Sequence, residues 1–170
     1  MDYLESAERS VSILRANRYV ALATHDEQGP WAAVVGFVPV APHYLYFVSR
    51  NCSRHGAAVL RNPEVSGAIY DSTSTLEEAD GIQFSGSCRE TDGSESLLRL
   101  FLDRAADSLA DPVDEELAAF RANEEFRLYE ITVREAYVLD QREWIERGID
   151  TRQRVDVAAL FAAVESGYAR

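Results

Sequence analysis

The sequence predicts a mainly β protein with added helices, of the α+β class, built on a six-stranded antiparallel barrel. Short apolar runs bounded by Gly, Pro, Asn and Asp recur along the chain, which is the pattern of strands joined by turns. Most of the helical pattern comes late in the chain, so strands and helices do not alternate as in a parallel sheet. A chain of 170 residues suits one hydrophobic core, and we expect residues 1–170 to form a single domain.

The first 70 residues contain the patterns of two helices and four strands. Leu4, Ala7, Val11 and Leu14 recur at helical spacing, which predicts an amphipathic helix at the start. Segment 31–40 is rich in Val and almost wholly apolar, which predicts a strand buried on both faces. The expected helices span residues 3–16 and 53–61, and the expected strands span residues 19–24, 31–40, 44–49 and 65–70, with a polar turn over residues 25–30.

The rest of the chain adds two strands and three helices. Apolar residues alternate through Ile82 and Phe84, and again after Phe126, which predicts two strands, the second with a bend near Thr132-Val133. The expected strands span residues 81–90 and 126–140, and the expected helices span residues 93–109, 113–123 and 156–168. We expect residues 71–80 to form a polar loop, whereas the pattern of residues 143–150 predicts no clear element.

The charge balance narrows the class of partner. The formal net charge is −12, whereas nucleic acids and anionic membranes bind to positive surfaces, so we expect neither as a partner. All 17 basic residues are Arg, and the chain contains no Lys. Any contact with a phosphate must therefore come from Arg, His, hydroxyl groups or backbone N–H groups.

The cysteines, histidines and apolar runs also indicate the cellular compartment and whether a metal site is expected. Cys52 and Cys88 have no metal-binding spacing, and two thiols without a secretory signal fit a reducing compartment. No apolar run approaches the ~20 residues of a membrane helix, so we expect a cytoplasmic protein. The three His residues are scattered along the chain, and we expect no metal site.

The turn Ser53-Arg54-His55 is the strongest candidate for a binding site. It follows a strand and opens a short helix, where free backbone N–H groups and the helix dipole favour an anion. A phosphate is the natural ligand for a hydroxyl, a guanidinium and an imidazole in this position. Other roles remain open for each residue: Ser53 as a helix cap, Arg54 as a solvated charge and His55 as a packing residue.

The order of several segments resembles a known family. These segments are the strand end Ala21–Thr24, a turn with Asp26 and Gly29-Pro30, a strand end at Ser49, the Ser53-Arg54-His55 turn, Asn62-Pro63 and the strand segment Gly81–Gly86. Together they resemble the FMN-binding split barrel of the pyridoxamine 5'-phosphate oxidase superfamily, over roughly residues 10–140. The stretch Phe126–Ile131 and Trp144 look closest to its small bacterial members.

The resemblance implies a homodimer with two FMN sites at the subunit interface. The Ser53-Arg54-His55 turn corresponds to the turn that binds the FMN phosphate in the family. Val48 and Ser49 correspond to two residues that line the flavin, and Gln83 corresponds to a Gln that contacts the flavin. The segment Ala33–Val38 would lie along the isoalloxazine ring. An alternative role remains open for Gln83, whose side chain could bond only to a neighbouring loop. The implied cofactor-binding residues are Val34, Val48, Ser49, Ser53, Arg54, His55 and Gln83.

The implied activity is FMN-dependent electron or hydride transfer on a small-molecule substrate, with a reductant such as NAD(P)H. Pyridoxamine 5'-phosphate oxidase activity itself is not expected, because the vitamin oxidase has Arg and Lys where this chain has uncharged residues near Ala33 and Val38. His55 likewise stands in place of a Lys. The alternative is a non-catalytic module on the same fold that binds or senses flavin, haem or a deazaflavin.

Overall fold

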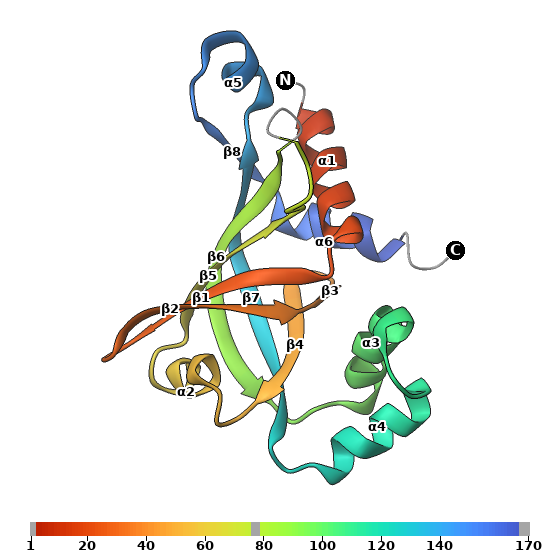
Figure 1. Ribbon diagram of the computed structural model, residues 1–170. Coiled ribbons are helices and arrows are strands. Elements are labelled where there is room, and N and C mark those ends of the chain that lie inside the picture. Colours follow the sequence, from red (N-terminus) through yellow and green to blue (C-terminus); the bar gives the residue numbers. More distant parts are fainter. Residues whose placement is uncertain (1–2, 76–78, 167–170) are drawn as a thin grey trace.

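The computed structural model describes residues 3–75 and 79–166, and its centre is an antiparallel sheet of eight strands curled into a half-barrel (Figure 1). The strands are β1 (Tyr19–Asp26), β2 (Gly29–Gly36), β3 (Val38–Val40), β4 (Tyr44–Arg50), β5 (Glu64–Tyr70), β6 (Gly81–Thr91), β7 (Phe126–Leu139) and β8 (Arg152–Val155). The helices are α1 (Tyr3–Ala16), α2 (Arg54–Arg61), α3 (Glu95–Ala105), α4 (Val113–Ala122), α5 (Gln141–Arg147) and α6 (Val157–Ser166), with a 3-10 turn at Ala106–Ser108.

The strands follow the order β2-β1-β5-β6-β7-β4-β3, and β8 lies beside β7. Strand β7 holds the sheet together, because it pairs with β6 along most of its length, with β4 through its first half and with β8 near its end. Strand β2, at one edge, contacts β4 near the other, so the sheet curls back toward itself. The predicted fold class, a mainly β split barrel with added helices, is confirmed, but the number of strands is eight rather than six.

The two additional strands have different origins. The segment predicted as one strand over residues 31–40 is two strands, β2 and β3, separated at Phe37, whose N–H donates to the carbonyl oxygen of Arg18 at 3.1 Å. Strand β8 is only four residues long and includes two arginines, so it is too short and too polar to show an alternating pattern.

The prediction that segment 31–40 is buried on both faces is wrong for β2. This strand lies at an edge of the sheet, where Val34 is 73% exposed and Trp31 is 41% exposed, and Val35 is its one buried residue. A continuous apolar run has the same appearance whether its second face is covered or open, because periodicity does not report what packs against it.

The predicted bend near Thr132-Val133 takes the form of a β-bulge. Ser85 pairs with Glu135 and Gly86 pairs with Val133, which leaves Arg134 without a partner on β6. A Cβ atom on Gly86 would lie 2.2 Å from the carbonyl oxygen of Thr132, so glycine alone allows the two strands to approach this closely.

Helices α1 and α6 lie together beside the sheet and helices α3 and α4 form another pair, whereas α2 and α5 lie apart from both pairs (Figure 1). Helices α1 and α6 contact each other and contribute Leu14, Leu160, Phe161 and Val164 to the main core. Helices α3 and α4 pair with each other and form a smaller core of Leu98, Leu102 and Leu117, which reaches Val48 of β4. Among the described residues, no helix has both the length and the apolar character needed to cross a membrane.

Two segments differ in detail from their predictions. Segment 143–150, which predicted no element, contains most of α5. The closing helix ends at Ser166, and the last two residues of the predicted range lie outside the described residues, as do residues 76–78 of the predicted loop 71–80.

Candidate functional site

Helix α2 begins where the sequence predicts, and Ser53 is its N-cap. The backbone N–H of Gly56 donates to Ser53 Oγ at 3.1 Å, and the N–H of Ala57 donates to the carbonyl oxygen of Ser53 at 2.9 Å. These two bonds leave the N–H groups of Arg54 and His55 as the open donors of the first turn. The predicted capping role of Ser53 is therefore confirmed, and the turn still offers backbone donors to an anion.

Ser49, Ser53 and His55 form one hydrogen-bonded cluster. Ser49 Oγ lies 2.7 Å from His55 Nε2 and 3.3 Å from Ser53 Oγ. Burial lowers the pKa of the His55 imidazole from its ordinary value of 6.5, so the side chain is neutral at pH 7. His55 thus acts at neutral pH as a hydrogen-bond partner that orients Ser49, rather than as a second cation beside Arg54.

Arg54 lies over the ring of Trp31. Its guanidinium carbon is 4.3 Å from the ring centroid, which is a cation–π contact between α2 and the edge strand β2. Arg54 is exposed and forms no ion pair within the part of the chain that the structure describes. Its donors therefore remain available beside the open N–H groups of the turn, and the indole holds the guanidinium in place.

Tyr129 packs against the first turn of α2, and this contact was not predicted from the sequence. Its ring stacks on Phe47 at 4.9 Å between centroids, and its buried hydroxyl has no hydrogen-bond partner among the described residues. A Cβ atom on Gly56 would lie 2.7 Å from this hydroxyl. Glycine at position 56 is what allows the first turn of α2 to pack directly on Tyr129.

Val48 and Ser49 are neighbours in sequence but point to opposite faces of the sheet, because side chains alternate along a strand. Ser49 joins the α2 turn, whereas half-buried Val48 packs beneath α3 with Phe101. Val38, which the resemblance places beside the isoalloxazine ring, is 1% exposed within its own small core.

Val34 and Gln83 lie together on the outer face of the sheet. They belong to one cross-strand row, in which Val34 pairs with Ala21, Ala21 with Ala68, and Ala68 with Gln83. Both are exposed, and the two residues between them are small. This row forms a largely apolar strip on the surface of one chain.

The α2 turn and Gln83 are far apart within one chain. Ser49 pairs with Arg127 of β7, and Gln83 pairs with Tyr137 of the same strand. These β7 positions are about ten residues apart, on the order of 30 Å of strand at ~3.3 Å per residue. The structure therefore brings Ser49, Ser53, Arg54 and His55 together but does not bring Gln83 to them.

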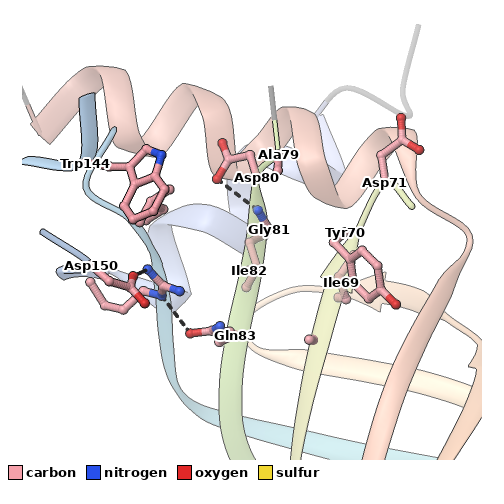
Figure 2. Close-up of a pocket in the computed structure, with 13 residues that line it drawn as sticks. Ile69, Tyr70, Asp71, Ala79, Asp80, Gly81, Ile82, Gln83, Trp144 and Asp150 are labelled. Carbon is pink, nitrogen blue, oxygen red and sulfur yellow. Dashed lines mark hydrogen bonds and ion pairs between the residues drawn. The ribbon is translucent and has the colours of Figure 1, made fainter. Parts of the chain in front are cut away.

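Gln83 instead lines a pocket near the start of β6, which is shown in Figure 2. The pocket has a volume of about 410 Å³ and lies between the ends of β5 and β6, helix α5 and the start of β8. Gln83 Oε1 accepts a hydrogen bond from Arg152 Nε at 2.9 Å, and the pocket is also lined by Tyr70 and Trp144. The sequence predicted no element for much of α5, so it did not point to this pocket.

Comparisons with known proteins agree with this architecture. Residues 7–140 match the protein family described as pyridoxamine 5'-phosphate oxidase. A comparison with curated protein sequences found no match.

Several solved structures share the fold. A haem-binding protein from Mycobacterium smegmatis has a TM-score of 0.68 and 18% identity, over 92% of this chain and 60% of that chain. HutZ, a haem storage protein from Vibrio cholerae, has a TM-score of 0.60 and 18% identity, over 75% of this chain and 89% of its own. General stress protein 26 from Bacillus anthracis has a TM-score of 0.62 and 16% identity, over 89% of this chain and 99% of its own.

Proposed function

Because the chain belongs to the pyridoxamine 5'-phosphate oxidase family, we propose that it binds FMN between two copies of itself and acts as an FMN-dependent oxidoreductase. The observation that carries the proposal is the set of hydrogen-bond donors gathered at the start of α2. Open N–H groups, two serine hydroxyls and the guanidinium of Arg54 converge there. We place the protein in the cytoplasm, in keeping with its two free cysteines.

The donor set of this site fits a phosphate monoester. In the first turn of α2, the N–H groups of Arg54 and His55 can bind phosphate oxygens, and Arg54 adds a charge-assisted bond. Ser49 and Ser53 can donate or accept as the ligand requires, because hydroxyl groups rotate. The isoalloxazine ring supplies the electron or hydride transfer when FMN is bound, and the residues of this chain hold and orient it.

A second copy of the chain completes the proposed site. The apolar row from Val34 to Gln83 is exposed in one chain, and Tyr19 and Tyr70 on the same face are 59% and 52% exposed. Pairing two such faces would bury apolar surface and would bring Gln83 of the partner subunit toward a flavin held at α2. We expect light scattering to give a mass near twice 19.0 kDa, and a mass near 19.0 kDa would contradict the dimer.

The substrate is expected to differ from pyridoxamine 5'-phosphate. The vitamin oxidase has charged residues near the positions that correspond to Ala33 and Val38, and Val38 itself lies in a core where a charge would be costly. We propose a small-molecule substrate that does not rely on these two charges, with a reductant such as NAD(P)H. No side chain near the α2 turn is assigned as a proton donor or acceptor for the substrate.

Titration with FMN tests the cofactor proposal. We expect a change in flavin fluorescence at micromolar protein, and Arg54→Ala should weaken FMN binding about tenfold or more, the effect of losing one charged hydrogen bond. Arg99→Ala, which removes an exposed arginine on α3, is the matched control and should bind as the parent does. No change in fluorescence at micromolar levels would refute FMN binding.

A rate measurement separates an oxidoreductase from a binding module. NAD(P)H should reduce the bound flavin faster than it reduces free FMN, because the protein orients the ring. Equal rates would favour a module that stores or senses the flavin.

Haem is the second candidate ligand, because two proteins with this fold are described as a haem-binding protein and a haem storage protein. The absorption spectrum of the purified protein discriminates between the candidates: a Soret band indicates haem, and bands near the flavin region indicate FMN or a deazaflavin. Retention of a haem spectrum after gel filtration would favour this candidate.

A further inference from the structure

We propose that His55 couples phosphate binding at the start of α2 to the uptake of a proton from solvent. His55 acts in this step as a positioning residue: it donates Nε2–H to Ser49, and the Ser49 hydroxyl then donates to the phosphate. The inference rests on the proposed function, because the phosphate is that of FMN. It adds to that function a dependence of FMN affinity on pH.

The Ser49 hydroxyl has one proton and two neighbours that can accept it. Ser49 Oγ lies 2.7 Å from His55 Nε2 and 3.3 Å from Ser53 Oγ. While His55 Nε2 carries a lone pair, Ser49 donates across the shorter of these contacts, because a hydroxyl group donates only one hydrogen bond. Ser49 then presents only lone pairs to a phosphate oxygen, and the two acceptors repel each other.

A proton on Nε2 reverses the direction of this hydrogen bond. The His55 ring then donates to Ser49 Oγ, and the Ser49 proton is free to point at an incoming oxygen. A phosphate oxygen bound by Ser49 would lie two hydrogen bonds from His55 Nε2, roughly 5.5 Å at most.

The charge of the ligand favours the imidazolium over the neutral ring. A phosphate monoester carries about 1.5–2 negative charges near pH 7. An opposite charge within ~4–6 Å of a histidine stabilises its protonated form, so a bound phosphate should raise the pKa of His55.

The free chain disfavours the same proton. His55 is half-buried, and its ring lies 6.1 Å from that of Phe47 between centroids. Burial lowers the pKa of its imidazole below the ordinary value of 6.5. Because the free and the phosphate-bound chains would hold this proton with different strength, binding and protonation are linked.

The charged side chains on the elements around α2 lie mostly in pairs of opposite sign, so their fields at His55 largely cancel. These pairs are Asp26 of β1 with Arg61 of α2, Glu90 of β6 with Arg127 of β7, and Arg50 of β4 with Glu125.

The remaining neighbours do not supply the titration. Arg54 lies with its guanidinium over Trp31 of β2 and keeps its charge throughout the neutral range. Burial raises the pKa of Tyr129 in β7 and that of Cys88 in β6 to about 12, so both stay neutral. The exposed thiol of Cys52 lies in the preceding turn, outside the contact between His55 and Ser49.

NMR titration of the histidines tests the coupling in the unaltered chain. The chain has three histidines, and single His→Gln variants of His25 and His43 assign their imidazole signals, which leaves that of His55. We expect FMN to move the midpoint of the His55 titration to higher pH, whereas riboflavin, which lacks the phosphate, should not move it. A midpoint that stays in place with FMN bound, or an equal shift with riboflavin, would overturn the proposal.

FMN affinity gives a second readout, which a merely structural role for His55 would not move. His55→Gln places an amide N–H near the position of Nε2 but cannot titrate. The ratio of parent to variant affinity should rise about threefold or more from pH 8 to pH 6, within the tenfold per pH unit that one linked proton allows. This ratio cancels the titration of the FMN phosphate itself, and a constant ratio would contradict the coupling.

The matched control is His43→Gln. His43 precedes the start of β4, whereas Ser49 lies near the end of that strand, and the His43 ring packs against Tyr44 instead. This variant should keep the pH dependence of the parent. Loss of the dependence in His43→Gln would show that it does not arise at His55.

The outcomes separate this inference from the proposed function. If FMN binds to the parent at no pH between 6 and 8, the proposed function fails and the coupling fails with it. If FMN binds with the same pH dependence in the parent and in His55→Gln, the proposed function stands and only the coupling fails.

Discussion

The side-chain oxygen of Ser49 lies 2.7 Å from Nε2 of His55, and this contact ties the end of β4 to the first turn of α2. The strand end and the helix start are thereby held as one unit. The geometry of the proposed anion site is consequently set before any ligand arrives, which lowers the entropy that binding must remove.

Capping of α2 by Ser53 should be measurable as stability. Ser53→Ala removes the acceptor for the Gly56 N–H and should lower the free energy of unfolding by about 1 kcal/mol, measured by urea denaturation. Ser94→Ala is a matched control, because Ser94 occupies the N-cap of α3 without a side-chain capping bond. An equal loss in both variants would argue against the capping account.

Stability should depend on the protonation of His55. Burial lowers the pKa of His55 below 6.5, so below that pH the unfolded chain takes up a proton that the folded chain resists. The contribution is complete above about pH 6.5 and is lost as the pH falls from that value toward the folded pKa. His55→Gln should flatten this part of the stability profile, measured by urea unfolding across the range, and an unchanged profile would contradict this account.

The contact between Trp31 and Arg54 should appear as a coupling energy. A double-mutant cycle with Trp31→Leu and Arg54→Gln should give about 0.5–1 kcal/mol, the usual size for an exposed cation–π pair. The control cycle pairs Trp31→Leu with Arg50→Gln, because Arg50 instead lies over Phe126. Coupling of similar size in the control cycle would show that the effect is not specific to the stacked pair.

The buried carboxylate of Glu130 should make Tyr46 important for stability. Tyr46 donates to Glu130 Oε2 at 2.6 Å, and Arg89 Nε donates to Oε1 at 2.8 Å. Tyr46→Phe should cost about 1.5–3 kcal/mol of unfolding free energy, the range for a bond to a charged group. Tyr44→Phe changes a half-buried tyrosine that has no such bond within the described chain, and thermal unfolding should show little effect.

Local chemistry explains which parts of the site the sequence could predict. Ser53 caps α2, and Asn62 ends it, because capping depends on a few consecutive residues. The positions of Arg54 and His55 at a helix start follow from the same short stretch. By contrast, Trp31 meets Arg54 only because β2 and α2 pack together, and Tyr129 reaches Gly56 from a strand far along the chain.

The same distinction explains the errors in the fold. The apolar pattern of segment 31–40 predicted a strand correctly but did not reveal that β2 is an edge strand with one open face. Strand β8 exists because β7 offers it a pairing edge, not because its own four residues favour a strand.

The sequence alone determined the antiparallel barrel class and the helix that begins at the Ser53 turn. These properties depend on periodicity, caps and side-chain chemistry, which act over a few neighbouring residues. Only the tertiary structure decided that Gln83 lies at the other end of the sheet, in a pocket with Trp144 and Arg152. Strand register and the packing of distant segments set that arrangement, and no local pattern encodes either one.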